Sequence, residues 1–126
     1  MEYVARKQII WVDSSEKDFL AFPGDVQDNM DGALTFASLG GKAENVKPLK
    51  GFSGASVLEI SESDSHGTFR CIYTVKYQTR IYVLHAFQKK SSTPKGHIDM
   101  VKRRLKRAAE REAEYLKQER KKEIGS

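Results

Sequence analysis

The chain has 126 residues, of which 39 % are hydrophobic and 31 % charged, and its net charge is +5. This length predicts one domain over residues 1–126, and the composition is that of an ordinary globular protein. No apolar run approaches the roughly 18–20 residues that cross a bilayer, and the first residues lack the apolar core of a signal peptide. The single Cys71 cannot form an internal disulfide, so we expect a cytoplasmic protein without membrane contact.

The charge is unevenly distributed along the chain. Residues 1–46 contain four basic and eight acidic side chains, whereas residues 102–122 contain ten basic and four acidic ones. A basic C-terminal element indicates a polyanion or an acidic partner protein. A solubilising helical face would explain the same composition equally well.

The first half of the chain predicts one strand and a helical hairpin. The apolar residues 7–12 are typical of a short strand. A first helix is expected to begin at Ser14 or Ser15 and to end at the Pro23-Gly24 pair. In the second helix the apolar residues recur at helical spacing until Gly40-Gly41, which gives it one apolar face.

The second half predicts a loop, three strands and a long helix. Residues 47–54 are interpreted as a loop rich in Gly and Lys, and residues 57–60, 68–77 and 80–87 as an antiparallel meander. A helix begins near Ile98, and residues 116–126 are expected to be a frayed basic tail. The predicted class is α+β, with an antiparallel sheet of about four strands, an N-terminal helical hairpin and a long C-terminal helix, in the order β-α-α-β-β-β-α.

The last predicted strand ends in a pair of lysines. Lys89 and Lys90 are followed by small polar residues and Pro94, and functional groups are often held where a strand runs into a loop. Two surface lysines in a solvated loop are the simpler explanation. Lys47, Lys50 and Arg70 can however reach the same surface of a meander, where a guanidinium offers two parallel donors to a phosphate.

The remaining pattern favours phosphate chemistry without a metal or cofactor. The three histidines, His66, His85 and His97, do not have metal-site spacing, and no nucleotide-binding glycine loop is present. A metal-free ribonuclease fits because RNA supplies its own nucleophile, the 2′-hydroxyl. The protein then has to stabilise the phosphorane charge and transfer protons.

These considerations give two sets of candidate residues. The catalytic candidates are Arg70, Lys90, Lys89 and His85, and the RNA-binding candidates are Lys47, Lys50, Lys95, His97, Arg103 and Arg104. Three alternatives stay open. Arg70 could form an ion pair with Glu59 on the next strand, His85 could be a hydrogen-bonded core histidine, and His97 could simply cap the last helix.

Several segments resemble the HigB branch of the RelE/ParE superfamily, including its phage-derived members. They are residues 11–18, 47–52, 57–60, 69–73 and 82–90, followed by Thr93-Pro94 and Asp99…Arg104-Leu105. The resemblance implies a type II toxin that cleaves mRNA on the ribosome and arrests growth. It also implies a cognate antitoxin, usually of the helix-turn-helix type, in a hetero-oligomeric complex.

The resemblance also bears on individual residues. Arg70 matches the phosphate-binding arginine of the family, and Lys90, or else Lys89, matches a basic residue at the end of the last strand. RelE carries two lysines where this chain has Leu58–Ser61, and a tyrosine near Gly96-His97. These departures favour an alternative function, that of a non-enzymatic relative such as a ParE-like topoisomerase inhibitor or a phage-derived binding module.

Overall fold

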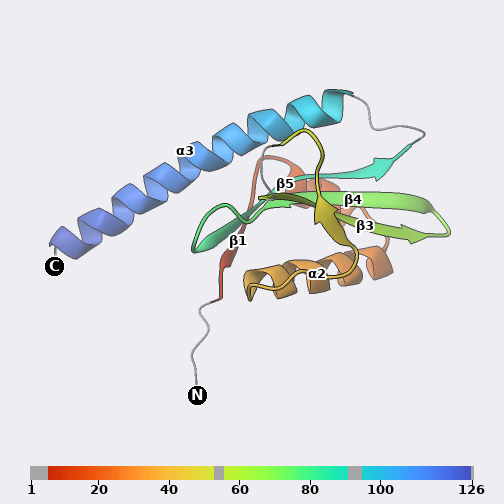
Figure 1. Ribbon diagram of the computed structural model, residues 1–126, viewed down its shortest axis with the longest axis horizontal. Coiled ribbons are helices and arrows are strands. Elements are labelled where there is room, and N and C mark those ends of the chain that lie inside the picture. The colour runs from red at the N-terminus through yellow and green to blue at the C-terminus, as the bar shows by residue number, and fades with distance from the viewer. Residues whose placement is uncertain (1–5, 53–55, 91–94, 126) are drawn as a thin grey trace, which may run out of the picture.

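The computed structural model describes residues 6–52, 56–90 and 95–125. The first strand is followed by two helices, then by four consecutive strands and a long helix, an order typical of an α+β protein (Figure 1). In chain order they are β1 (Gln8–Trp11), α1 (Ser15–Leu20), α2 (Gly24–Ser38), β2 (Val46–Pro48), β3 (Val57–Asp64), β4 (Gly67–Thr74), β5 (Arg80–Lys89) and α3 (Lys95–Gly125). The predicted class, the helical hairpin and the long last helix are confirmed, while the assignment of residues 1–126 to one domain stays a prediction.

The sheet differs from the expected one by an extra strand and by one parallel pair. Its order is β1-β5-β4-β3-β2, and β1 runs parallel to β5 whereas the other pairs are antiparallel. β2 lies in the segment that we expected to be a loop. It is only three residues long and contains Pro48, which is tolerated because β2 is an edge strand.

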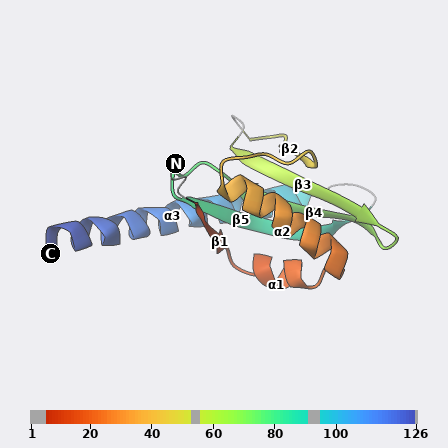
Figure 2. The same ribbon diagram turned by 90° about the horizontal axis from the view of Figure 1, so that it is seen from below.

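The helices cover the two faces of this sheet (Figures 1 and 2). The α1–α2 hairpin packs on one face, and α3 crosses the other. Because β5 has strands on both sides and helices on both faces, Ile81–Leu84 have no exposed surface. This explains the uninterrupted apolar run in the sequence. The buried residues on the hairpin face include Phe19, Met30, Leu34, Ile60 and Tyr73, and those on the α3 face include Ile72, Tyr82, Leu84, Val101 and Ala108.

Helix α3 is held to the sheet by a buried polar cluster. Glu112 accepts hydrogen bonds from Arg80 (3.1 Å) and from the hydroxyl of Tyr82 (2.9 Å), and Arg80 also pairs with Glu119. Beyond Glu119 the helix continues to Gly125 past the edge of the sheet (Figures 1 and 2). The fraying of residues 116–126 stays a prediction. No helix in the described ranges is both long enough and apolar enough to cross a membrane.

Candidate active site

A pocket of about 420 Å³ opens on the α3 face of the sheet, beside the first turn of α3. Its size lies in the range of small-molecule sites. It gathers four of the cations that the sequence analysis selected from separate segments. Its lining consists of Lys47, Pro48, Leu49, Lys50, Glu59, Arg70, Lys89 and Ile98.

The strand register explains how these residues meet. Lys47 of β2 pairs with Glu59 of β3, and Glu59 pairs in turn with Ile72 of β4. Residues directly opposite each other on neighbouring strands share a face of the sheet. Arg70 lies two residues from Ile72 along β4 and therefore points to the same face. The convergence of Lys47, Glu59 and Arg70 thus follows from pairing alone.

Arg70 and Glu59 form an ion pair across β3 and β4. Their side chains are only 13 % and 8 % exposed, so each charge depends on the other for compensation. The cross-strand pair that the sequence left open is therefore formed. Arg70 Nε is buried and has no hydrogen-bond partner among the described residues, which leaves a donor beside the pocket.

Glu59 is the functional candidate that the sequence analysis treated only as a partner of Arg70. The sequence did contain an indication of this role, because an acidic residue between Leu58 and Ile60 interrupts a buried apolar strand. A carboxylate in such a place is retained only when a cation compensates it. In the pocket wall it adds a proton acceptor to a set of donors.

A β-bulge in β5 decides which side chains reach the site. Tyr73 pairs with Val83 and Ile72 pairs with His85, so the register skips Leu84. One extra residue shifts the alternation of side chains by one position. As a result His85, Phe87 and Lys89 lie opposite Ile72, Arg70 and Thr68 on the α3 face. Uninterrupted alternation from Tyr82 would have turned them to the hairpin face.

His85 and His97 form a hydrogen-bonded pair next to the pocket. The distance from His85 Nε2 to His97 Nδ1 is 2.7 Å. Phe87 stacks on His97 with ring centroids 4.0 Å apart, and Phe87 is the register partner of Arg70. His97 therefore lies beside the pocket, since its neighbour Ile98 is one of the lining residues.

The surroundings of the two imidazoles favour their neutral forms. Burial, and then the charges of His97 and Arg104, lower the pKa of His85 to about 4, against a smaller opposing effect of Asp18. Burial also lowers the pKa of His97. The pair is thus neutral at pH 7, where it shares one hydrogen-bonded proton and can accept another.

The other predicted site residues lie outside this pocket. Lys90 and Lys95 are exposed, and neither is among its lining residues. Thr93 and Pro94 of the family motif lie outside the described residues. Arg103 lines a separate pocket of about 170 Å³, together with Asp13, Met100, Arg104 and Arg107.

Arg104 differs most from its expected role. It is only 8 % exposed, and its guanidinium donates to the carbonyl oxygen of Leu84 (3.0 Å) and to Ser14 Oγ (2.9 Å). Asp13 lies 3.6 Å from its Nε. The guanidinium of Arg104 is thus engaged in contacts inside the protein, whereas the neighbouring Arg103 is exposed.

Comparison with known proteins identifies the family of the chain. Residues 17–106 match the family model described as "Phage derived protein Gp49-like (DUF891)". The chain therefore belongs to the phage-derived Gp49-like family. Among curated protein sequences, no match reaches significance.

Solved structures define the fold class. A mutant of the Escherichia coli toxin RelE in the free state superposes with a TM-score of 0.56 at 14 % identity, covering 81 % of this chain and 97 % of RelE. The toxin–antitoxin complex RelBE2 from Mycobacterium tuberculosis gives a TM-score of 0.44 at 15 % identity, covering 71 % of this chain and 98 % of that one. The superposition on RelE confirms the RelE-like fold expected from the sequence motifs.

Proposed function

We propose that this protein is the toxin of a type II toxin–antitoxin pair and acts in the cytoplasm as an endoribonuclease that cleaves mRNA on the ribosome. One observation carries the proposal. A single pocket contains Lys47, Lys50, Arg70 and Lys89 together with the carboxylate of Glu59, and a histidine pair lies beside it. This set contains groups for every task of a metal-free RNA cleavage.

In the proposed reaction the RNA supplies the nucleophile. Glu59 accepts the proton of the 2′-hydroxyl as its oxygen attacks the adjacent phosphorus, and the bond to the 5′-oxygen breaks. The products are a 2′,3′-cyclic phosphate and a 5′-hydroxyl end. Arg70 and Lys89 stabilise the negative charge of the phosphorane, since ammonium and guanidinium groups are strong donors to phosphate oxygens.

The histidine pair protonates the leaving 5′-oxygen. Although both imidazoles are neutral in the free protein because their pKa values are lowered, a bound phosphate brings negative charge close to them. A nearby opposite charge favours the protonated form. Substrate binding therefore favours protonation of the histidine pair, which then acts as the general acid. His97 is the nearer of the two in sequence to the pocket lining, at Ile98, and His85 is hydrogen-bonded to it.

Exposed lysines would hold the RNA backbone on either side of the scissile bond. Lys47 and Lys50 lie at one rim of the pocket. Lys90, Lys95 and Arg103 are exposed around the start of α3 and would contact flanking phosphates. These contacts carry no base specificity.

We also propose a neutralising antitoxin as partner, as the family resemblance implies. The basic excess of residues 102–122 in α3 and the open pocket suit an acidic or amphipathic segment of that protein. The resulting complex would be hetero-oligomeric. The idea predicts a co-transcribed neighbouring gene, and it is rejected if the protein is harmless when it is expressed without one.

A second function, non-enzymatic binding on the same scaffold, is favoured by one observation. The charge of Arg70 is already compensated by Glu59 in the free protein, which lowers the positive charge available to a phosphate. A ParE-like topoisomerase inhibitor or a phage-derived binding module would not need a free guanidinium.

Induction in cells separates the two functions. Newly synthesised protein and the supercoiling of a reporter plasmid are followed together after induction. The ribonuclease predicts that translation stops first while supercoiling is unchanged. Loss of supercoiling with translation continuing would instead support the topoisomerase inhibitor.

A further inference from the structure

The β5 bulge is contacted by one side chain of α3. Leu84, the residue that the register skips, is fully buried, and its carbonyl oxygen accepts a hydrogen bond of 3.0 Å from Arg104 Nη1. Bulges disturb the regular ladder of strand hydrogen bonds, and a buried carbonyl needs a donor. Arg104 provides one from outside the sheet.

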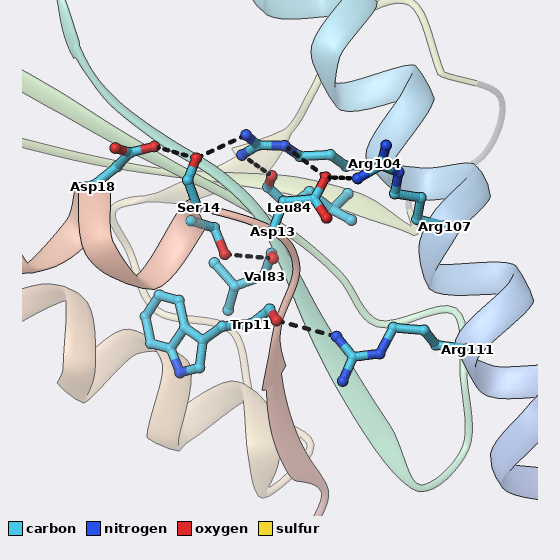
Figure 3. A network of polar contacts seen from close by, with 10 residues as sticks. Trp11, Asp13, Ser14, Asp18, Val83, Leu84, Arg104, Arg107 and Arg111 are labelled. Carbon is cyan, nitrogen blue, oxygen red and sulfur yellow. Dashed lines mark hydrogen bonds and ion pairs between the residues drawn. The ribbon is translucent and has the colours of Figure 1, made fainter.

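Arg104 is itself fixed from a third element. Its Nη2 donates to Ser14 Oγ at 2.9 Å, and Ser14 donates to Asp18 of α1 at 2.9 Å. Asp13 lies 3.6 Å from Arg104 Nε and 2.6 Å from Arg107 Nη1. Figure 3 shows the guanidinium of Arg104 between Ser14, Leu84 and Asp13, with Arg107 reaching only Asp13.

The consequence concerns the side chains beyond the bulge. His85, Phe87 and Lys89 lie on the α3 face because the bulge changes the phase of β5. His85 bonds to His97 of α3, while Arg104 lies two helical turns further along α3. The same helix thus contacts both the bulge and the histidine that the bulge turns toward it.

We propose that Arg104 is a positioning residue that holds the Leu84 bulge and so keeps His85 and Lys89 in register with the Arg70 pocket. This inference rests on the proposed ribonuclease function for its effect on rate, but not for its effect on structure. Arg104 does not touch the RNA. It acts through the backbone of Leu84, and Ser14 orients its guanidinium.

The variants that test this are Arg104→Lys and, as a matched control, Arg107→Ala. Arg104→Lys keeps the positive charge near His85 but cannot donate to Leu84 and Ser14 with a planar fork. Arg107→Ala removes a neighbouring arginine of the same network that reaches neither of these atoms. The readout is NMR of the free protein, by cross-strand contacts of Ile72 with His85 and of Tyr73 with Val83, and by the tautomers of His85 and His97.

We expect Arg104→Lys to lose the contact of Ile72 with His85 and the fixed tautomers, whereas Arg107→Ala keeps both. Unchanged contacts in Arg104→Lys, or equal losses in Arg107→Ala, would overturn the inference. If Arg104→Lys does not fold, Ser14→Ala decides. It removes the oxygen that orients Arg104 together with the hydrogen bond from Ser14 to Asp18, and α1 loses no side-chain cap with it. We then expect the tautomers of His85 and His97 to change in Ser14→Ala but not in Arg107→Ala. Unchanged tautomers in Ser14→Ala would overturn the inference.

Kinetics separate positioning from RNA binding. Misplacing His85 should lower kcat by about a hundredfold with little change in KM, whereas loss of an RNA contact would raise KM. A raised KM with unchanged kcat would overturn the inference. If the wild-type protein cleaves no RNA but the NMR contacts change as expected, the proposed function fails and the positioning role of Arg104 stands.

Discussion

At the scale of single residues, Arg70 and Glu59 act as one unit. Both are largely buried on neighbouring strands, so removal of either leaves an uncompensated charge inside the protein. Arg70 can nevertheless keep its ion pair with Glu59 and also bind a phosphate. Arg70 has five donors, one contact is made to Glu59, and Nε has no partner among the described residues.

Arg70→Ala is expected to affect both rate and stability. Cleavage should fall a hundredfold or more because a contact to the transition state is lost, and the free energy of unfolding should fall by about 3 kcal/mol because Glu59 loses its partner. Single-turnover cleavage and thermal unfolding measure the two effects. The sequence left the ion pair with Glu59 open but could not show how deeply it is buried.

Adding Glu59→Gln separates the two effects. In the double variant the buried carboxylate becomes a neutral amide, so most of the lost stability should return while cleavage stays low. Equal stability of the single and double variants would contradict the description of Arg70 and Glu59 as a mutually compensating pair.

His85 predicts a pH dependence of stability. Its pKa falls from 6.5 to about 4 in the folded state. Between these two pH values, His85 is therefore protonated in the unfolded chain and neutral in the folded one. The stabilisation is complete above pH 6.5 and is lost as the pH falls toward 4. Denaturant titrations at pH 7 and pH 5 should show a smaller loss for His85→Phe than for the wild type.

His66→Gln is the control for this measurement, since His66 is exposed in the turn between β3 and β4. It should keep the wild-type difference between pH 7 and pH 5. If His85→Phe loses as much stability as the wild type over this interval, another group is responsible for the effect.

At the scale of elements, periodicity predicted most of the fold. The apolar spacing of α2 and the alternation of Phe69, Cys71 and Tyr73 in β4 were sufficient to predict these two elements, because burial imposes those periods. β2 was missed because three residues with a proline carry no period. The β5 bulge was missed because Tyr82–Phe87 are all buried, and an apolar run without alternation does not show which residues share a face.

Glu112 tests the attachment of α3. Glu112→Ala removes the acceptor of both Arg80 and the Tyr82 hydroxyl, so the free energy of unfolding should fall by about 3 kcal/mol. Glu114→Ala, an exposed carboxylate on the same helix, should change it by less than about 0.5 kcal/mol. Urea unfolding compares them, and similar values for both would show that α3 is held mainly by its apolar contacts.

At the scale of the whole molecule, charge is divided between the two faces of the sheet. The hairpin carries the acidic excess of residues 1–46, and α3 carries the basic excess of residues 102–122. The sequence showed that these two segments differ in charge, but not that they lie on opposite faces or that Arg104 and Arg107 are engaged with Ser14 and Asp13. Only the fold brings residues ninety positions apart together.

RNA binding should therefore depend steeply on salt. Each phosphate contact to single-stranded RNA contributes about 0.7 to the slope of log affinity against log salt. Lys47→Ala combined with Lys50→Ala should reduce that slope, whereas Lys42→Ala, beside a pocket on the hairpin face, should leave it unchanged. Affinity that does not vary between low and moderate salt would exclude an electrostatic RNA interface.

The central claim is that the Arg70 pocket cleaves RNA, and single-turnover cleavage of mRNA on programmed ribosomes tests it most directly. The wild-type protein and Lys42→Ala should produce 5′-hydroxyl and 2′,3′-cyclic phosphate ends at equal rates. Folded Arg70→Lys, which keeps the charge but loses the paired donors, should be slower by about a hundredfold or more. Intact mRNA with the wild-type protein, or wild-type rates with folded Arg70→Lys, would contradict the claim.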